Sequence, residues 1–288
     1  MRKAAFLTGA LTLLLVACGE SQASEDRIEV SIGVTGADGQ FWNLISDRAA
    51  EEGIDIELIE FADYALPNTA LVNGEIDLNS FQHLAFLSQY NAEYDETITP
   101  IGSTVIAPLG LYSTNHESIE DIPDGGEIAL PNDPANTGRG LKVLESAGLI
   151  TLREDVGLYP TVDDIEENPK NLEFVLVVAQ QTPRVLPDVA GSIINSGIAT
   201  QADIFLDEAL VHDDPYSDEA APYINVFATR AEEKDNEAYH TIAQIYQEED
   251  IAQAVVDDSN GGNIVVDIPQ EDLQQTLDEL VQNLKEGQ

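Results

Sequence analysis

Basic residues and cysteine are what this chain of 288 residues has least of. Lys and Arg together number 12 against 54 Asp and Glu, which gives a formal net charge of −42. Binding to nucleic-acid phosphates needs a basic surface, so this balance argues against a nucleic-acid-binding protein. The single cysteine, Cys18, excludes both an intramolecular disulfide and a cysteine-based zinc site.

Catalytic and metal-binding motifs are missing as well. No G-x-S-x-G, H-E-x-x-H or G-x-x-x-x-G-K-[ST] pattern occurs. The four histidines lack the spacing of metal ligands, and acidic pairs are too frequent for a catalytic carboxylate dyad to be singled out. We therefore expect a protein that is not an enzyme and that holds no metal and no cofactor.

The N-terminus carries an export signal. Two basic residues precede the apolar run Ala4–Ala17, which is shorter than the roughly 20 residues of a membrane-spanning helix and is typical of a secretory signal peptide. The run ends in Leu-Val-Ala-Cys18, which resembles a bacterial lipobox. We predict a signal peptide over residues 1–17, lipidation of the Cys18 thiol and a flexible polar tether over 18–26. The alternative is an ordinary signal peptide in which Cys18 is incidental.

The rest of the chain predicts a folded α/β protein. Apolar residues make up 43% of the sequence, which argues against disorder despite the charge. Short β-branched runs alternate with segments of helical periodicity, as in α/β folds with largely parallel sheets. The expected strands are 29–34, 54–61, 76–80, 127–130, 172–179, 192–194 and 223–229, and the expected helices are 39–52, 67–72, one from about 82, 138–147, 232–247 and 270–285.

The simplest organisation is two α/β lobes, one inserted into the other. Residues 27–107 and 225–288 are predicted to form lobe I, and residues 108–224 to form lobe II. Ligand sites in open α/β sheets lie at the carboxyl ends of strands, so the residues that follow each predicted strand are the candidates for binding.

Arg139 is the first candidate. It follows a predicted strand and a turn-rich loop over 131–137, and the predicted helix would place it in the first turn. A helix N-terminus offers free N–H groups, and a guanidinium there can hold a carboxylate through two parallel hydrogen bonds. The alternative is that Arg139 pairs with a surface acid.

Aromatic residues form the second candidate group. Phe61 and Tyr64 follow one predicted strand, and Phe81 and His83 follow another, so their side chains can converge on one rim. Such a pocket suits a thioether, because sulfur–aromatic contacts contribute up to about 1.5 kcal/mol. The alternative is that these residues belong to the lobe core and its turns.

Asn195 is the third candidate, at the end of an apolar strand. Its amide has both donors and an acceptor, so it can bind the ammonium and the carboxylate of an amino acid together. The alternative is a turn-forming role, which is common for asparagine after a strand.

These residues belong to an ordered set of motifs that resembles a known family. The lipobox, F-A-D-Y-x-L-P-N-x-A-L, G-E-I-D-L-N-x-F-Q-H, I-A-P-L-G-L-Y-S, L-P-N-D-P-x-N-x-G-R and E-N-P-K-N-L follow one another as in the NlpA/MetQ-type methionine-binding lipoproteins, the solute receptors of ABC importers. The likeness runs from about residue 27 to 262. It implies the two-lobed, type II periplasmic-binding-protein fold, with two crossover strands and closure of the lobes around the ligand.

The resemblance also implies roles for the candidate residues. Arg139, with Asn136 nearby, would hold the ligand's carboxylate, and Asn195 would fix its backbone polar groups. The side-chain pocket would be lined by Phe61, Tyr64, Phe81 and His83.

The expected ligand is L-methionine, delivered to a membrane permease with a cytoplasmic ATPase. D-methionine and a methionine-containing dipeptide are alternatives within the class. A surface adhesin or an enzyme that uses the cleft are alternatives from other classes.

Removal of the signal peptide makes the net charge still more negative. The signal segment carries two of the twelve basic residues and no acid, so its removal takes the net charge to −44. Self-repulsion of that size destabilises a compact state, and at about 1 M salt the screening length falls to about 3 Å. We therefore expect a protein from a halophilic source that works in concentrated brine.

Overall fold

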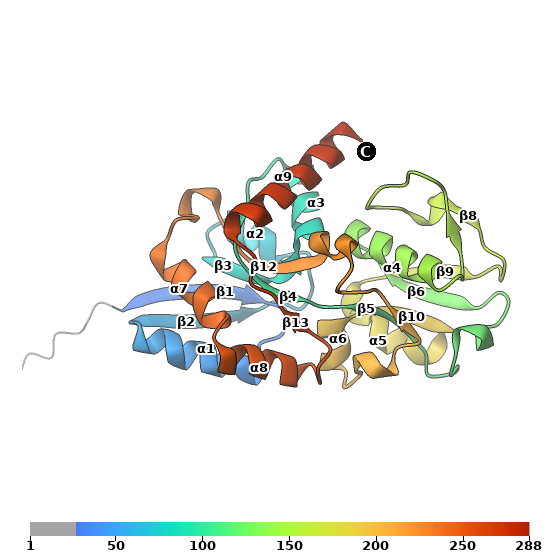
Figure 1. Ribbon diagram of the computed structural model, residues 1–288, viewed down its shortest axis with the longest axis horizontal. Coiled ribbons are helices and arrows are strands. Elements are labelled where there is room, and N and C mark those ends of the chain that lie inside the picture. The colour runs from blue at the N-terminus through green and yellow to red at the C-terminus, as the bar shows by residue number, and fades with distance from the viewer. Residues whose placement is uncertain (1–26, 288) are drawn as a thin grey trace, which may run out of the picture.

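The computed structural model describes residues 27–287, which form two α/β lobes side by side (Figure 1). The predicted signal peptide, the tether and Cys18 lie outside the described residues. Each lobe is built on its own sheet, with strand order β13-β4-β12-β3-β1-β2 in the first and β11-β5-β10-β6-β9 in the second.

The first sheet is mixed. Its strands β1, β2 and β3 run parallel, while β12 lies antiparallel between β3 and β4, and β13 pairs antiparallel with the other edge of β4. The strands are β1 (Ile28–Val34), β2 (Ile54–Glu60), β3 (Leu78–His83), β4 (Thr99–Ile106), β12 (Ile224–Thr229) and β13 (Ile264–Val265).

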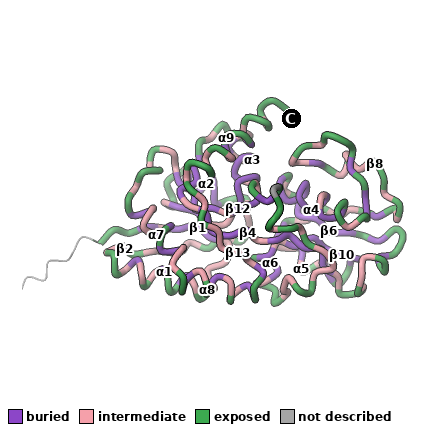
Figure 2. Tube along the Cα trace, in the orientation of Figure 1, coloured by how far each residue is buried: buried purple, intermediate pink, exposed green. Residues whose placement is uncertain are grey.

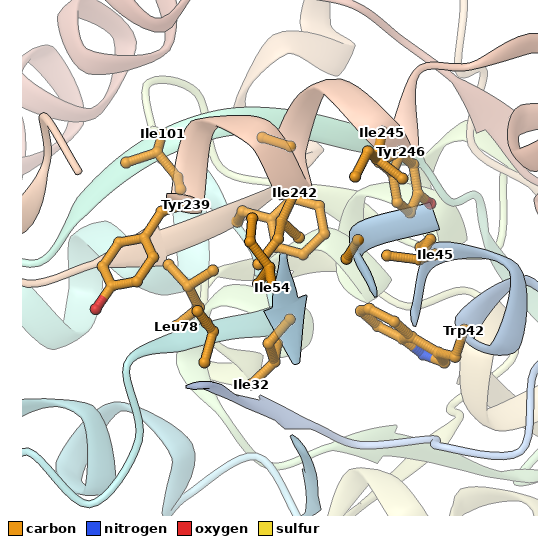
Figure 3. Packing of buried hydrophobic residues seen from close by; sticks show 14 of the residues in the cluster. Ile32, Trp42, Ile45, Ile54, Leu78, Ile101, Tyr239, Ile242, Ile245 and Tyr246 are labelled. Atoms are coloured by element: carbon orange, nitrogen blue, oxygen red, sulfur yellow. The ribbon is translucent and has the colours of Figure 1, made fainter. Parts of the chain in front are cut away.

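Helices cover both faces of this sheet. On one face α1, α7 and α8 bury an apolar cluster that includes Trp42, Ile45 and Ile242 (Figure 3). On the other face α2, α3 and α9 pack around a second cluster that includes Leu71 and Leu277. The helices are α1 (Gln40–Glu51), α2 (Pro67–Val72), α3 (Leu84–Tyr94), α7 (Glu237–Tyr246), α8 (Glu249–Asp258) and α9 (Gln270–Glu286).

The second sheet is mixed, and within it only β5 runs opposite to the other four strands. The parallel strands β9, β6 and β10 are followed by β5 and β11, which pair antiparallel. The elements of this lobe are β5 (Leu109–Tyr112), β6 (Glu127–Pro131), α4 (Pro134–Ser146), the hairpin β7 (Thr151–Leu152) and β8 (Ile165–Glu167), β9 (Glu173–Val177), α5 (Thr182–Val185), β10 (Gly191–Asn195), α6 (Ser196–Gln201) and β11 (Val211–His212).

Two crossovers connect the lobes. The chain leaves the first sheet at Ile106 and enters the second at Leu109, and it returns through the 3-10 helix η6 (Asp218–Tyr223) into β12. Buried residues concentrate along the two sheets and continue across the region between them (Figure 2). The fold class predicted from the sequence is therefore confirmed.

Several local predictions were wrong, and the helix expected from 232 begins only at Glu237. Helix α4 begins at Pro134 rather than Gly138, because the Asp133 carboxylate caps it by accepting from the Asn136 N–H at 2.9 Å and proline suits the first helical position. Arg139 consequently lies in the second turn. Strand β3 extends to His83 rather than ending at Ser80, and neither strand β4 nor helix α8 was predicted.

No helix within residues 27–287 is long and apolar enough to cross a membrane.

Candidate ligand-binding cleft

A cleft of about 720 Å³ lies between the lobes, and both lobes contribute to its walls. It opens at the carboxyl ends of β1 and β3 and faces the N-terminal parts of α4 and α6. Six of the seven predicted site residues line it: Tyr64, Phe81, His83, Asn136, Arg139 and Asn195.

Phe61 is the seventh predicted residue and is not among those that line the cleft. Its ring lies over Gly33, where an added Cβ would come within 3.0 Å of it, and packs on the apolar cluster that contains Ile76. Trp42 belongs to the buried cluster under α1 and also lines the cleft, and its indole N–H donates to the Gly36 carbonyl at 3.2 Å.

Three aromatic rings form one wall of the cleft. Tyr64 lies 5.9 Å from Phe81 and 6.0 Å from Phe86 between ring centroids, and Phe81 and Phe86 are 5.7 Å apart in an edge-to-face arrangement. Burial, with the nearby Asp133 carboxylate, raises the pKa of the Tyr64 phenol well above its usual range. The wall is therefore uncharged and apolar.

His83 connects this wall to lobe II. Its Nδ1 accepts from the Phe86 N–H at 3.1 Å and so caps α3, which places the ring proton on Nε2. Nε2 then donates to Asn136 Oδ1 at 3.3 Å. Burial and the positive charge of Arg139 lower the pKa of His83 to about 3, so the imidazole is neutral at physiological pH.

A chain of amides continues from His83 into lobe II. Asn136 Nδ2 donates to both carboxylate oxygens of Asp133, at 2.9 and 3.0 Å, so its Oδ1 faces His83 and Asn195. Asn195 Nδ2 donates to that Oδ1 at 2.7 Å. The remaining oxygen, Asn195 Oδ1, is buried and accepts no hydrogen bond from any described residue.

Arg139 lies at the back of the cleft and is 3% exposed. Its Nε donates to Asp213 Oδ2 at 2.5 Å, its Nη2 donates to the Ala107 carbonyl at 2.9 Å, and its Cζ lies 4.2 Å from the centre of the Tyr223 ring. The arginine thus pairs with an acid, as the alternative interpretation expected, and also lines the cleft. Among the side chains that the structure describes, none is hydrogen-bonded to Nη1.

Three residues of this site were not predicted from the sequence. Phe86 stands one helical turn after His83, and that spacing could have indicated it. Asp213 and Tyr223 carry no local signal, because only the tertiary structure brings them to Arg139.

The cleft thus offers a cation with a free donor, an unsatisfied buried acceptor and an apolar aromatic wall. Within the described part of the chain, no three His, Cys, Asp or Glu side chains are grouped so as to hold a metal ion. The arrangement can bind a small zwitterion that has an apolar side chain.

The two lobes, their two crossovers and the cleft between them define the class: a type II substrate-binding protein. The model of the NlpA lipoprotein family matches residues 30–266. The D-methionine-binding lipoprotein MetQ of Yersinia pestis is 39% identical over 258 residues, which cover 88% of this chain and 93% of that protein. The chain belongs to the NlpA lipoprotein family.

Solved structures agree with this assignment. Protein PG110 from Staphylococcus aureus is 39% identical, with a TM-score of 0.84 over 87% of this chain and 99% of that one. A nutrient-binding protein from Burkholderia cenocepacia, whose structure holds methionine, is 35% identical, with a TM-score of 0.77 over 83% of this chain and 99% of that one. The resemblance seen in the sequence motifs is confirmed.

Proposed function

We propose that this protein captures methionine outside the cytoplasm and delivers it to the permease of an ABC importer. The observation that carries the proposal is the buried, unpartnered Oδ1 of Asn195, a residue that lines the same cleft as Arg139 and the aromatic wall. A buried acceptor without a donor costs about 1–3 kcal/mol, and a ligand's ammonium group would remove that cost.

The polar end of the cleft suits the backbone of an amino acid. Arg139 has Nη1 left for the ligand's carboxylate, and Asn195 Oδ1 accepts from the ammonium group. Asn136 contributes indirectly, because its Oδ1 already accepts from Asn195 and His83 and so holds both in place.

The aromatic wall suits a thioether side chain. Tyr64, Phe81 and Phe86 present ring edges and faces to the cleft, and sulfur–aromatic contacts contribute about 0.3–1.5 kcal/mol each. The relatives support this assignment, since one is named as a methionine-binding lipoprotein and another holds methionine. L-methionine is the expected ligand, and D-methionine and a methionine-containing dipeptide are the alternatives to compare with it.

Closure of the two lobes would retain the ligand. Contacts between the lobes already exist beside the cleft: Gln201 Nε2 donates to the Thr35 carbonyl at 2.6 Å, and Ser196 Oγ donates to Asn263 Oδ1 at 2.9 Å. A ligand that contacts both lobes favours this closed state through its differential affinity, and the closed form is the one that docks on the permease.

The protein is proposed to be anchored by lipid on Cys18 after removal of residues 1–17, with residues 18–26 as a tether. Lipoprotein relatives support the anchor. Several acyl chains on one residue give stable attachment, where one chain would be marginal. The protein is not an enzyme in this proposal, and the relatives' role as transporter binding proteins argues against both cleft catalysis and adhesion.

Calorimetric titration tests the assignment. Wild-type protein is expected to bind one L-methionine, while Arg139→Ala and Asn195→Ala raise Kd by at least about a hundredfold through loss of a charge-assisted and a buried hydrogen bond. Arg153→Ala is the control, because that exposed arginine pairs with Asp164 away from the cleft. Titrations with D-methionine and glycyl-methionine rank the alternatives.

Two outcomes would contradict the proposal. One is the absence of binding of any of these ligands to ligand-free, folded wild-type protein. The other is unchanged affinity of the Arg139→Ala variant, which would remove the carboxylate assignment. Native mass spectrometry of freshly purified protein adds an independent check, because a retained adduct of methionine's mass is expected.

A further inference from the structure

The Arg139 guanidinium touches both crossovers between the lobes. Its Nη2 donates to the carbonyl of Ala107, which lies between β4 and β5 in the first crossover. Its Cζ lies over the ring of Tyr223, the last residue before β12 in the second crossover, at 4.2 Å from the ring centre. The group that would bind the ligand's carboxylate is thus attached to the hinge.

The Asp213 carboxylate holds the Arg139 guanidinium in this position. One carboxylate oxygen, Oδ2, accepts from Arg139 Nε at 2.5 Å, and the other, Oδ1, accepts from the N–H of Leu109 at 2.9 Å. The Asp213 N–H also donates to the Leu109 carbonyl at 3.2 Å. A single side chain therefore ties the guanidinium to the first residue of β5.

The guanidinium is planar, so holding it at Nε and Nη2 over the Tyr223 ring fixes the direction of Nη1. We infer that Asp213 is a positioning residue for ligand binding: it orients Arg139 toward the ligand's carboxylate and links that contact to the first crossover. This inference rests on the proposed function. Because the crossovers must change conformation when the lobes open, a carboxylate bound to Arg139 holds the hinge in its closed geometry.

The negative charge of Asp213 and its orienting role have opposite effects on the affinity for the ligand's carboxylate. An experiment can therefore separate them. The carboxylate is negative and lies next to a site for an anion, so its Coulomb effect alone weakens binding of a carboxylate. Neutralising it would then tighten binding of methionine. If orientation dominates, neutralising it weakens binding instead.

The experiment compares Asp213→Asn with wild type using two probes, methionine and methioninamide, which lacks the carboxylate. We expect the preference for methionine over methioninamide to fall at least about tenfold in Asp213→Asn, a loss of about 1.4 kcal/mol. A purely electrostatic role raises that preference, since the amide probe is a cation and methionine a zwitterion. A general loss of stability moves both probes together and leaves the preference unchanged, so either result would overturn the inference.

Asp55→Asn is the matched control, because Asp55 pairs with Arg27 through an exposed contact of 2.7 Å on β2 and does not line the cleft. Its preference should equal that of wild type. The hinge contact is read separately by hydrogen exchange of the peptide that contains Leu109 in ligand-free protein, where Asp213→Ala is expected to speed exchange at least about tenfold. Unchanged exchange would also overturn the inference.

The two proposals fail differently. If the wild-type protein binds neither probe, methionine is not its ligand. The rate of hydrogen exchange at Leu109 then still shows whether Asp213 stabilises the first crossover. Wild-type protein that binds methionine, with an undiminished preference in Asp213→Asn, leaves the proposed function in place and removes the positioning role.

Discussion

His83 shows how one buried side chain can serve two lobes. It caps α3 through Nδ1 and reaches Asn136 in lobe II through Nε2, and both contacts need the neutral ring with its proton on Nε2. Protonation of Nδ1 would replace an acceptor by a donor facing the Phe86 N–H. The same group therefore carries part of the protein's sensitivity to acid.

The direction of this sensitivity follows from the pKa of His83. Burial and Arg139 lower it from 6.5 to about 3 in the folded protein, while the unfolded chain keeps the ordinary value. The unfolded state then binds more protons as pH falls below about 6.5. The contribution of His83 to stability is complete above that pH and is lost progressively down to about pH 3, at up to about 1.4 kcal/mol per pH unit.

His83→Asn isolates this contribution. Asparagine can still cap α3 but does not titrate, so the variant is expected to start less stable at pH 7 and to lose less free energy of unfolding than wild type between pH 6.5 and 4. Urea unfolding at several pH values, at constant salt, measures both curves. The many carboxylates contribute equally to the two proteins, so parallel curves would show that His83 is not held neutral.

At the scale of elements, α4 packs so closely against its neighbours that two of its positions leave little room for a side chain. A Cβ on Gly138 would lie 3.0 Å from the backbone of Leu158 and Tyr159, and a Cβ on Gly140 would lie 2.9 Å from Leu130. Helix α4 carries Arg139 between these two glycines. Its approach to the lobe II sheet and to the loop near Tyr159 therefore decides where the guanidinium lies.

Gly138→Ala is expected to destabilise the protein by about 1–3 kcal/mol, because backbone atoms must move to make room for the methyl group. Gly197→Ala in α6 is the matched control, since no atom lies within 4 Å of its added Cβ and alanine favours a helix by up to about 1 kcal/mol. Chemical unfolding in one buffer compares the two variants. Equal stability of both would contradict the tight packing of α4.

At the scale of the whole molecule, charge is the dominant feature. Ten basic residues fall within the described part of the chain, and several of them are engaged structurally: Lys170 donates to the carbonyls of Ile119, Glu120 and Ile122, and Arg230 donates to those of Leu71 and Ile76. Even if every basic side chain paired with one acid, most acids would remain unpaired. Self-repulsion therefore opposes the compact state in dilute buffer.

Salt is expected to raise the melting temperature of the mature protein. Between 0.1 M and 1 M sodium chloride the screening length falls from about 10 Å to about 3 Å, which weakens repulsion between exposed acids. The variant Asp278→Asn/Glu279→Gln on the exposed face of α9 should show a smaller rise than wild type, because it carries two fewer negative charges. A melting temperature that does not rise with salt would contradict adaptation to brine.

Local signals predicted much of the fold. Helix α2 has the predicted bounds, 67–72, because proline at its start and Asn73-Gly74 after its end are signals contained in the sequence. Strands β1, β6 and β12 likewise agree within a residue or two. The start of α4 was misplaced because the cap at Asp133 was overlooked, and α8 was missed although its buried residues Ile251 and Val255 have helical spacing.

The sequence by itself determined the α/β class, the family and the identity of most side chains that face the cleft, because periodicity, caps and ordered motifs are local. Only the tertiary structure decided how those side chains are held. It placed the partly buried Phe61 against the apolar cluster around Ile76, brought Phe86 to the aromatic wall and placed Asp213 and Tyr223 against Arg139. The physical reason is that the contacts of Arg139 with Asp213 and Tyr223 join residues more than 70 positions apart, and the packing of the elements sets these distances, which no spacing along the chain encodes.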